Sequence, residues 1–317
     1  MKKEKKSGII ALAVVLAITV VIAAVNLVGA RGSSVMPVRG AKKAPSFERG
    51  GYIAELHIEG VIQEANQTYN QEWLLSTIDM LKADRKNRGI ALFIDSPGGT
   101  VYEADEAYLA LQDYKTSGKK LYVYQAQLAA SGGYYISCAA DKIYANRNTL
   151  TGSIGVIYGS SIDLSGLFEK IGIKSQTIHA GKNKNMMNYN EPFTDEQKEI
   201  VQSVADAAYE QFTGIVAMSR NIPLFEVKKL ADGRIYTAKQ ALDNKLVDKI
   251  DSWENMIKDM RDNEFGGKNF QVKKFEYKRS QTLRDMLLEK ALGAENSAAL
   301  SKLSGELTMQ YPAYLYR

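Results

Sequence analysis

The sequence predicts an α/β domain whose strands are mostly parallel. Short apolar runs, such as residues 89–95, alternate with stretches in which apolar side chains recur at helical spacing, such as residues 101–115. This alternation is typical of parallel sheets, because each helix carries the chain back to the start of the next strand. The composition, 45% hydrophobic and 24% charged, is that of a globular chain and excludes a mainly disordered one.

The expected elements follow one another along residues 52–244. Short runs rich in β-branched or aromatic residues predict strands at 52–58, 60–62, 89–95, 121–125, 142–145 and 173–179. Apolar residues at helical spacing predict helices at 71–86, 101–115, 134–140, 164–171, 194–220, 227–231 and 238–244. The apolar face of the first helix consists of Trp73, Leu74, Ile78 and Leu81. The longest helix is expected to begin after Thr194, which forms a capping-box pattern with Gln197.

An apolar segment near the N-terminus predicts a membrane anchor. Four lysines precede an uncharged run, and residues 9–28 supply the roughly 20 apolar positions that a helix needs to cross a bilayer. We therefore expect residues 1–28 to form a single-pass signal anchor in the cell membrane, in contact with lipid, with the rest of the chain outside. A cleaved secretory signal stays open, because Val28-Gly29-Ala30 resembles a cleavage site. A buried core helix is disfavoured, because the segment has no polar face.

The excess positive charge is confined to the N-terminal segment. Residues 1–50 carry nine Lys or Arg and two Asp or Glu, whereas the other 267 residues carry 32 basic and 34 acidic side chains. A basic surface on the body is thus disfavoured, and no nucleic-acid partner is expected.

Residues 29–50 are rich in Gly, Pro and basic residues and predict a linker. We assign residues 51–265 to one folded domain and residues 266–317 to a tail.

Two glycine-rich segments stand where a strand is followed by a helix. In Asp95-Ser-Pro-Gly-Gly-Thr100, adjacent glycines allow a close approach of the backbone, and their amides could bind an anion. An ordinary strand–helix turn explains the same residues, and a phosphate loop is excluded because the Gly-Lys-Ser/Thr ending is missing. In Ala129-Ala-Ser-Gly-Gly-Tyr-Tyr135, a single serine is flanked by small residues. A nucleophile in a tight turn and a helix N-cap are both open for Ser131.

Few side chains in the sequence could act as a general base for Ser131. The chain has only two histidines: His57, in the first strand, is expected to be structural, whereas His179 precedes Gly181-Lys-Asn-Lys184 and stays a candidate. A lysine can replace histidine as a base if apolar surroundings lower its pKa from about 10.4 towards about 7–8. Lys184 precedes Met186 and Met187, although a single lysine is more commonly a solvated charge. The only cysteine, Cys138, excludes an intrachain disulfide and a multi-cysteine metal site.

The segments at residues 95–100, 129–135 and 181–184 resemble motifs of the signal peptide peptidase A family in its short, single-domain form. Two further segments complete the resemblance in the same order along the chain: Leu150-Thr-Gly-Ser-Ile-Gly-Val156 and Gly233-Arg-Ile-Tyr-Thr-Ala-Lys-Gln-Ala-Leu242. The resemblance covers roughly residues 51–252. It implies the fold of the Clp protease proteolytic subunit and the crotonases, with stacked ββα units that assemble into homo-oligomeric rings. It also implies a membrane-anchored serine endopeptidase that degrades remnant signal peptides and needs no cofactor or metal.

The resemblance assigns a role to five residues. Ser131 resembles the nucleophile, Lys184 the general base of a Ser-Lys dyad, and Ser153 the serine that orients the lysine. The backbone amides of Gly98 and Gly132 resemble the oxyanion hole.

Two other functions stay open. An acyl-CoA-processing enzyme of the crotonase type would use similar amides but would not need Ser131 and Lys184. A non-catalytic membrane scaffold would form rings through the same fold. The Clp-type protease is distinguished by a histidine about 25 residues after its serine, whereas residues 151–158 contain none.

The tail, with small residues at 293–299 and Tyr314-Leu-Tyr316, is either disordered or enters an active site as an inhibitor or a self-cleavage substrate.

Overall fold

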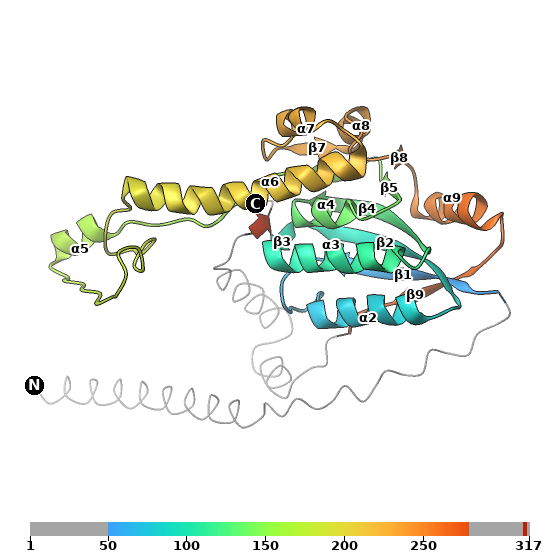
Figure 1. Cartoon of the computed structure of the whole chain (residues 1–317), viewed down its shortest axis with the longest axis horizontal. Coiled ribbons are helices and arrows are strands. Elements are labelled where there is room, and N and C mark those ends of the chain that lie inside the picture. Colours follow the sequence, from blue (N-terminus) through green and yellow to red (C-terminus); the bar gives the residue numbers. More distant parts are fainter. Residues whose placement is uncertain (1–49, 279–312, 316–317) are drawn as a thin grey trace, which may run out of the picture. The chain divides into compact units, whose positions relative to one another are not determined.

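The computed structural model of the chain describes residues 50–278 and 313–315, which belong to one unit, Arg49–Arg317 (Figure 1). The expected anchor, residues 1–28, lies outside the described residues, as do residues 29–49 of the expected linker. None of the helices in the described ranges combines the length and the apolar character that a bilayer-crossing helix requires.

A largely parallel sheet of eight strands forms the centre of the molecule (Figure 1). Its main path runs β7 (Ile235–Thr237), β6 (Leu150–Gly152), β4 (Lys120–Ala130), β2 (Asn87–Ser96), β1 (Tyr52–Glu59) and β9 (Gln271–Phe275). Strand β5 (Lys142–Ala145) pairs with β4, and β8 (Lys249–Ile250) pairs with β5. All these pairs are parallel except β6 with β7. The predicted class, an α/β fold with mostly parallel strands, is confirmed.

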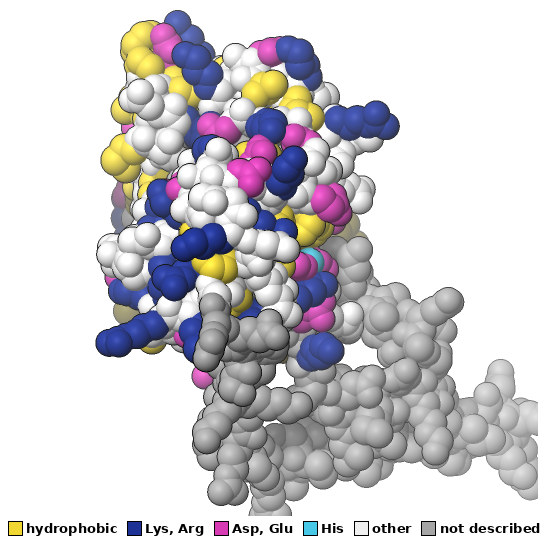
Figure 2. Space-filling view, turned by 90° about the vertical axis from the view of Figure 1, so that its right-hand side faces the viewer, with side chains coloured by type: hydrophobic (Ala, Val, Ile, Leu, Met, Phe, Trp, Pro, Cys, Tyr) yellow, Lys and Arg dark blue, Asp and Glu magenta, His cyan; other side chains and the backbone are white. Residues whose placement is uncertain are grey.

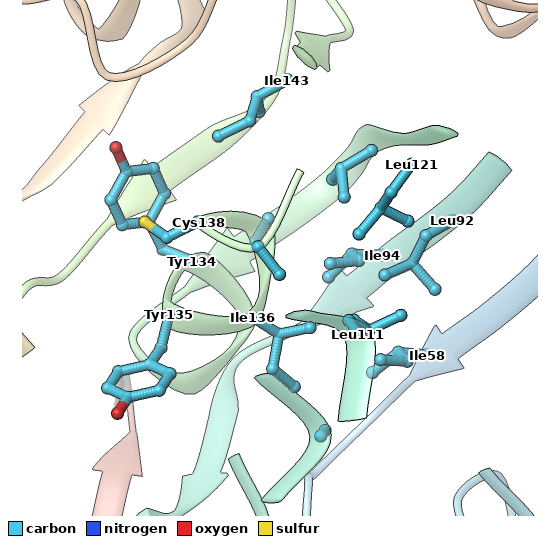
Figure 3. Packing of buried hydrophobic residues seen from close by; sticks show 14 of the residues in the cluster. Ile58, Leu92, Ile94, Leu111, Leu121, Tyr134, Tyr135, Ile136, Cys138 and Ile143 are labelled. Carbon is cyan, nitrogen blue, oxygen red and sulfur yellow. The ribbon is translucent and has the colours of Figure 1, made fainter. Parts of the chain in front are cut away.

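Helices cover both faces of this sheet. Helices α2 (Gln71–Ala83), α3 (Val101–Lys115) and α4 (Gly132–Ser137) contribute to the larger core, and Figure 3 shows α4 side chains packed near residues of β2 and β4. Helix α9 (Trp253–Phe265) packs its apolar face in a second cluster that contains Ile53 and Tyr122. Each aliphatic side chain buried in this way contributes about 1.5–3 kcal/mol, which explains why the strands of the central sheet are nearly continuous apolar runs.

An arm formed by α5 (Ser165–Ile171) and the first half of α6 (Asp195–Arg220) extends away from the sheet (Figure 1). Helix α6 begins with the expected capping box between Thr194 and Gln197. Its buried residues are confined to Phe212–Val216, so only its C-terminal half packs on the body. Beyond α6 lie α7 (Leu224–Leu230) and α8 (Ala238–Asp243), above the sheet edge in Figure 1.

Several elements differ from the sequence-based expectation. Residues 60–62 make only one bridge, from Ile62 to Gly99, and residues 173–179 form no strand, because no neighbouring strand lies beside them in the described chain. The sheet also continues past residue 265, the expected end of the domain, because β9 pairs with β1. Helix α9 was not expected, because its few apolar residues stand in a highly charged stretch.

Candidate active site

Ser131 stands at the sharp turn between β4 and α4. Its backbone has φ 54° and ψ −116°, a conformation that side-chain-bearing residues rarely adopt. Two hydrogen bonds hold the turn: the Ser131 amide donates to Gly152 O (2.7 Å), and the Tyr135 amide donates to Ser131 O (2.8 Å). Such strain persists only where the surrounding structure enforces it, and it is common at active sites.

The Ser131 hydroxyl is buried but unused. The residue is 1% exposed, and its Oγ has no hydrogen-bond partner among the described residues. It also makes no capping hydrogen bond, although Ser131 occupies the N-cap position of α4. The N-cap alternative therefore does not explain this serine. A buried polar group without a partner is costly and is expected where a substrate or a second group completes the site.

Glycines allow the nucleophile turn to approach the β3 segment (Gly98–Thr100). A Cβ added to Gly132 would lie 3.2 Å from the amide nitrogen of Gly99 and 3.3 Å from the Cα of Gly98. A Cβ added to Gly99 would overlap the carbonyl oxygen of Ile62 at 1.7 Å. The glycines of the two motifs are thus required by close backbone contact, as expected from the sequence.

The two expected oxyanion amides lie beside Ser131, the expected nucleophile. The Gly132 amide is the first of α4 and follows Ser131 directly. Gly98 has φ 103°, and its amide donates to Ser96 Oγ at 3.1 Å. The Gly98 amide would have to leave this hydroxyl, or share its hydrogen, to bind an oxyanion.

Ser153 is brought to the same place by the pairing of β4 with β6. Because Gly152 O accepts the Ser131 amide hydrogen, the residue that follows β6 lies next to the turn at Ser131. Ser153 is 6% exposed and has φ 49°, and its amide donates to Arg234 O (2.8 Å). Ser131, Ser153, Gly98 and Gly132 therefore form one cluster.

Lys184 is not part of this cluster within the chain. It lies between α5 and α6, in a turn that is tied to the start of α6 by an ion pair of Lys182 with Glu196. From Glu196 to Phe212, where α6 packs against α4, the helix rises about 24 Å. The side chain of Lys184 is exposed and has no carboxylate partner among the described residues. The apolar burial expected around it is thus absent from the single chain.

Neither histidine hydrogen-bonds to Ser131 Oγ within the described residues. His57 lies on β1, where its two ring nitrogens contact Glu55 (2.8 Å) and Glu59 (2.7 Å). His179 is exposed in the arm, and its Nδ1 contacts Gly181 O (3.1 Å). The carboxylate of Asp95, from the first glycine-rich motif, accepts the Leu128 amide hydrogen and holds β2 to β4.

A strand from the C-terminal tail lies along the β3 edge of the site. Strand β10 (Ala313–Leu315) pairs antiparallel with β3, so that Tyr314 stands opposite Gly99 and Leu315 opposite Gly98. It also contacts α4, which begins after the nucleophile. Residues 293–299 and Tyr316 lie outside the described residues. The backbone position of β10 matches the expectation that the tail enters an active site.

Sequence reasoning gave no role to Tyr135, although it stood in the serine motif. Its hydroxyl donates to Asp105 Oδ1 on α3 (2.5 Å) and accepts a hydrogen bond from Gln211 on α6 (2.7 Å). Tyrosines buried on a short helix need hydroxyl partners, and this requirement could have indicated the role of Tyr135 from the sequence.

Burial raises the pKa of Tyr134 well above its usual range and that of Cys138 to about 12, so both stay protonated. No cluster of metal-ligating side chains was found in residues 50–278.

Comparisons with known proteins agree with the resemblance. A putative signal peptide peptidase SppA from Enterococcus faecium is 37% identical over 216 residues, which cover 66% of this chain and 62% of that protein. This chain therefore matches less than two thirds of that relative. A putative protease from Synechocystis is 34% identical over 203 residues (64% of this chain, 71% of that protein). The chloroplastic serine protease SPPA of Arabidopsis thaliana is 32% identical over 202 residues (63% and 29%).

Among the solved structures that are similar is a mutant of ClpP1 from Listeria monocytogenes. It is 19% identical, with a TM-score of 0.45 over 64% of this chain and 94% of that one. The family comparison matches residues 113–265, which include Ser131, Ser153 and Lys184, to peptidase family S49. With the relatives described above, this match shows that the chain belongs to peptidase family S49.

Proposed function

We propose that the chain is a membrane-anchored serine endopeptidase that degrades remnant signal peptides, with a Clp/crotonase-like fold and its catalytic domain outside the cell membrane. The observation that carries the peptidase activity is the buried, unpaired hydroxyl of Ser131 in a strained turn beside glycine amides. Membership of family S49 supports the same reaction class. The apolar run at residues 9–28 supports the membrane anchor and lipid contact.

In the proposed reaction, the neutral amine of Lys184 removes the proton from Ser131 Oγ, which attacks a peptide carbonyl carbon. The amides of Gly98 and Gly132 stabilise the oxyanion of the tetrahedral intermediate. The protonated amine then gives its proton to the leaving nitrogen as the C–N bond breaks and leaves an acyl-enzyme on Ser131. Water, deprotonated by Lys184, releases the new carboxylate and restores the serine. Ser153 orients the lysine.

The position of β10 supports a binding mode for the substrate. An extended peptide can pair antiparallel with β3 as Ala313–Leu315 does, and its main chain would then run past Gly98 towards α4. Main-chain pairing with a strand edge gives affinity with little dependence on side-chain identity. Such tolerance suits a protease of remnant peptides that differ in sequence.

The separation of Ser131 and Lys184 leads us to propose that the lysine is supplied by a second copy of the chain in a homo-oligomeric ring. The arm exposes large apolar side chains, among them Ile178 (94% exposed), Ile171 (58%) and Ile173 (50%). Exposed apolar side chains gathered on one segment indicate a protein contact. Burial at such a contact would also give Lys184 the apolar surroundings that a basic amine needs.

Mixing two inactive variants tests the dyad and its assembly together. Ser131→Ala and Lys184→Ala should each reduce peptide hydrolysis by at least about 1,000-fold and leave the fold intact. Mixing the two variants, after dissociation and reassembly, should restore part of the activity, because a Lys184→Ala copy still provides Ser131 and a Ser131→Ala copy still provides Lys184. Full activity of the Lys184→Ala variant, with loss in His179→Ala, would contradict the lysine. Inactive variants that stay inactive when mixed would contradict the second-copy arrangement.

A further inference from the structure

We propose that Tyr135 is a positioning residue that locks the nucleophile helix α4 to the arm helix α6. The inference rests on the proposed function, because it concerns how Ser131 is held relative to the arm that carries Lys184. Tyr135 lies one helical turn after Ser131, and its amide donates to Ser131 O. A shift of Tyr135 therefore moves the backbone of the nucleophile directly.

The hydroxyl of Tyr135 joins three helices. It donates to the carboxylate of Asp105 on α3 (2.5 Å) and accepts from the amide of Gln211 on α6 (2.7 Å). The first of these bonds is charge-assisted and therefore stronger than a bond between neutral groups. Since Tyr135 is fully buried, loss of this hydroxyl would leave Asp105 and Gln211 without these contacts.

The ring of Tyr135 is fixed from the same two helices. Tyr108 of α3 meets it edge-on, with centroids 5.4 Å apart, and Phe212 of α6 packs against it at 5.0 Å. Phe212 and Gln211 are adjacent residues near the point where α6 stops projecting and becomes buried. The root of the arm is thus attached to the helix that begins after Ser131.

This attachment has a consequence for catalysis. In an assembly in which one copy presents Lys184 to another, the direction of α6 determines the position of that lysine. The turn at the start of α4 determines the position of Ser131 Oγ. Tyr135 belongs to α4 and contacts α6, so it links the two positions. Displacing reacting groups by about 1 Å can cost about 100-fold in rate, so loss of the hydroxyl should reduce turnover without removing the substrate-binding edge.

The adjacent Tyr134 provides a matched control. It is also fully buried on α4, but its hydroxyl donates to the backbone carbonyl of Leu246 (2.9 Å). Figure 3 shows the two rings pointing away from α4 in different directions. Tyr134→Phe and Tyr135→Phe each remove one buried hydroxyl and keep the ring, so the melting temperature of each variant reports the structural cost against which its kcat is compared.

The full-length chain and its Tyr134→Phe, Tyr135→Phe and Ser131→Ala variants are compared for kcat, KM and melting temperature. We expect Tyr135→Phe to lower kcat about 10–100-fold with KM changed less than about twofold, and Tyr134→Phe to retain kcat within about threefold. Adding Gln211→Leu to Tyr135→Phe should cause little further loss, because both changes break the same link.

Equal kcat values in the two tyrosine variants would overturn the inference, as would losses that simply follow the melting temperature. A wild-type chain whose hydrolysis does not depend on Ser131 would instead contradict the proposed function, and the inference with it.

Discussion

At the scale of single residues, Ser131 combines an unpaired hydroxyl with a backbone conformation that favours glycine. The cost of holding a side-chain-bearing residue at φ 54° and ψ −116° is about 1–3 kcal/mol. The chain bears this cost because only a side chain at this turn places a hydroxyl beside the amides of Gly98 and Gly132. Serine is therefore favoured here by its proposed role as the nucleophile and opposed by the backbone conformation.

This conflict predicts that Ser131→Gly is more stable than Ser131→Ala, although both are inactive. Glycine relieves the strain but adds about 0.5–1 kcal/mol of unfolded-state entropy, which leaves a net gain of up to about 2.5 kcal/mol. For a domain of this size we expect the glycine variant to melt up to roughly 10 °C higher. Calorimetry of the two variants measures the difference directly, and an alanine variant with the higher melting temperature would refute the argument.

At the scale of elements, α6 is held at its C-terminal end, because its N-terminal half projects from the body. Its last residue, Arg220, is only 7% exposed and holds Asp248 with two hydrogen bonds (2.6 and 3.1 Å), while its Nε donates to Lys245 O (2.8 Å). Asp248 in turn accepts the Ile143 amide hydrogen of β5. The C-terminus of the arm helix is thereby fastened to the sheet.

Removing this attachment should destabilise the whole domain. Arg220→Met removes two hydrogen bonds to the partly exposed carboxylate of Asp248 and is expected to lower the free energy of unfolding by about 1.5–3 kcal/mol. Lys239→Met is the control, because its ion pair with Asp243 on α8 is exposed, and its loss should cost less than about 1 kcal/mol. Urea unfolding compares the two, and losses of equal size would show that Arg220 is no more than a surface charge.

Elements with strong local patterns could be predicted from the sequence, whereas those that depend on partners could not. Residues 101–115 and 142–145 form the expected helix and strand, because their apolar spacing matches the face that they bury. Residues 173–179 have the β-branched composition of a strand but no neighbouring strand in the described chain, and Ile178 is 94% exposed. A strand is stabilised by its neighbours, so composition alone misled here.

The same limit applies to the site. Ser131, Ser153, Gly98 and Gly132 were assigned to one site by the resemblance to a known family. The structure brings them together because the carboxyl ends of neighbouring parallel strands meet at one edge of the sheet. No local pattern tells how far a 26-residue helix projects. The separation of Lys184 from Ser131 therefore became apparent only in three dimensions.

At the scale of the whole molecule, surface charge and chain path both bear on substrate choice. On the face shown in Figure 2, basic and acidic side chains are interspersed. One edge of the candidate site is occupied by the chain's own C-terminal strand, β10. Strand β10 uses the β3 edge that an extended peptide would need, although more than 200 residues separate Leu315 from Gly98 in sequence.

Because β10 and a substrate would use the same edge, the tail should act as a competitor tethered to its own enzyme. Ending the chain after Gln310 is expected to lower KM several-fold and leave kcat unchanged, since a competitor blocks binding without altering the bound state. A synthetic peptide of residues 311–317, added to the shortened enzyme, should raise KM again. If shortening reduced kcat instead, β10 would be a structural part of the site and not a competitor. Intact mass separates inhibition from self-cleavage: a tail lost from the wild type but kept in Ser131→Ala is a substrate, whereas identical C-termini in both leave inhibition as its role.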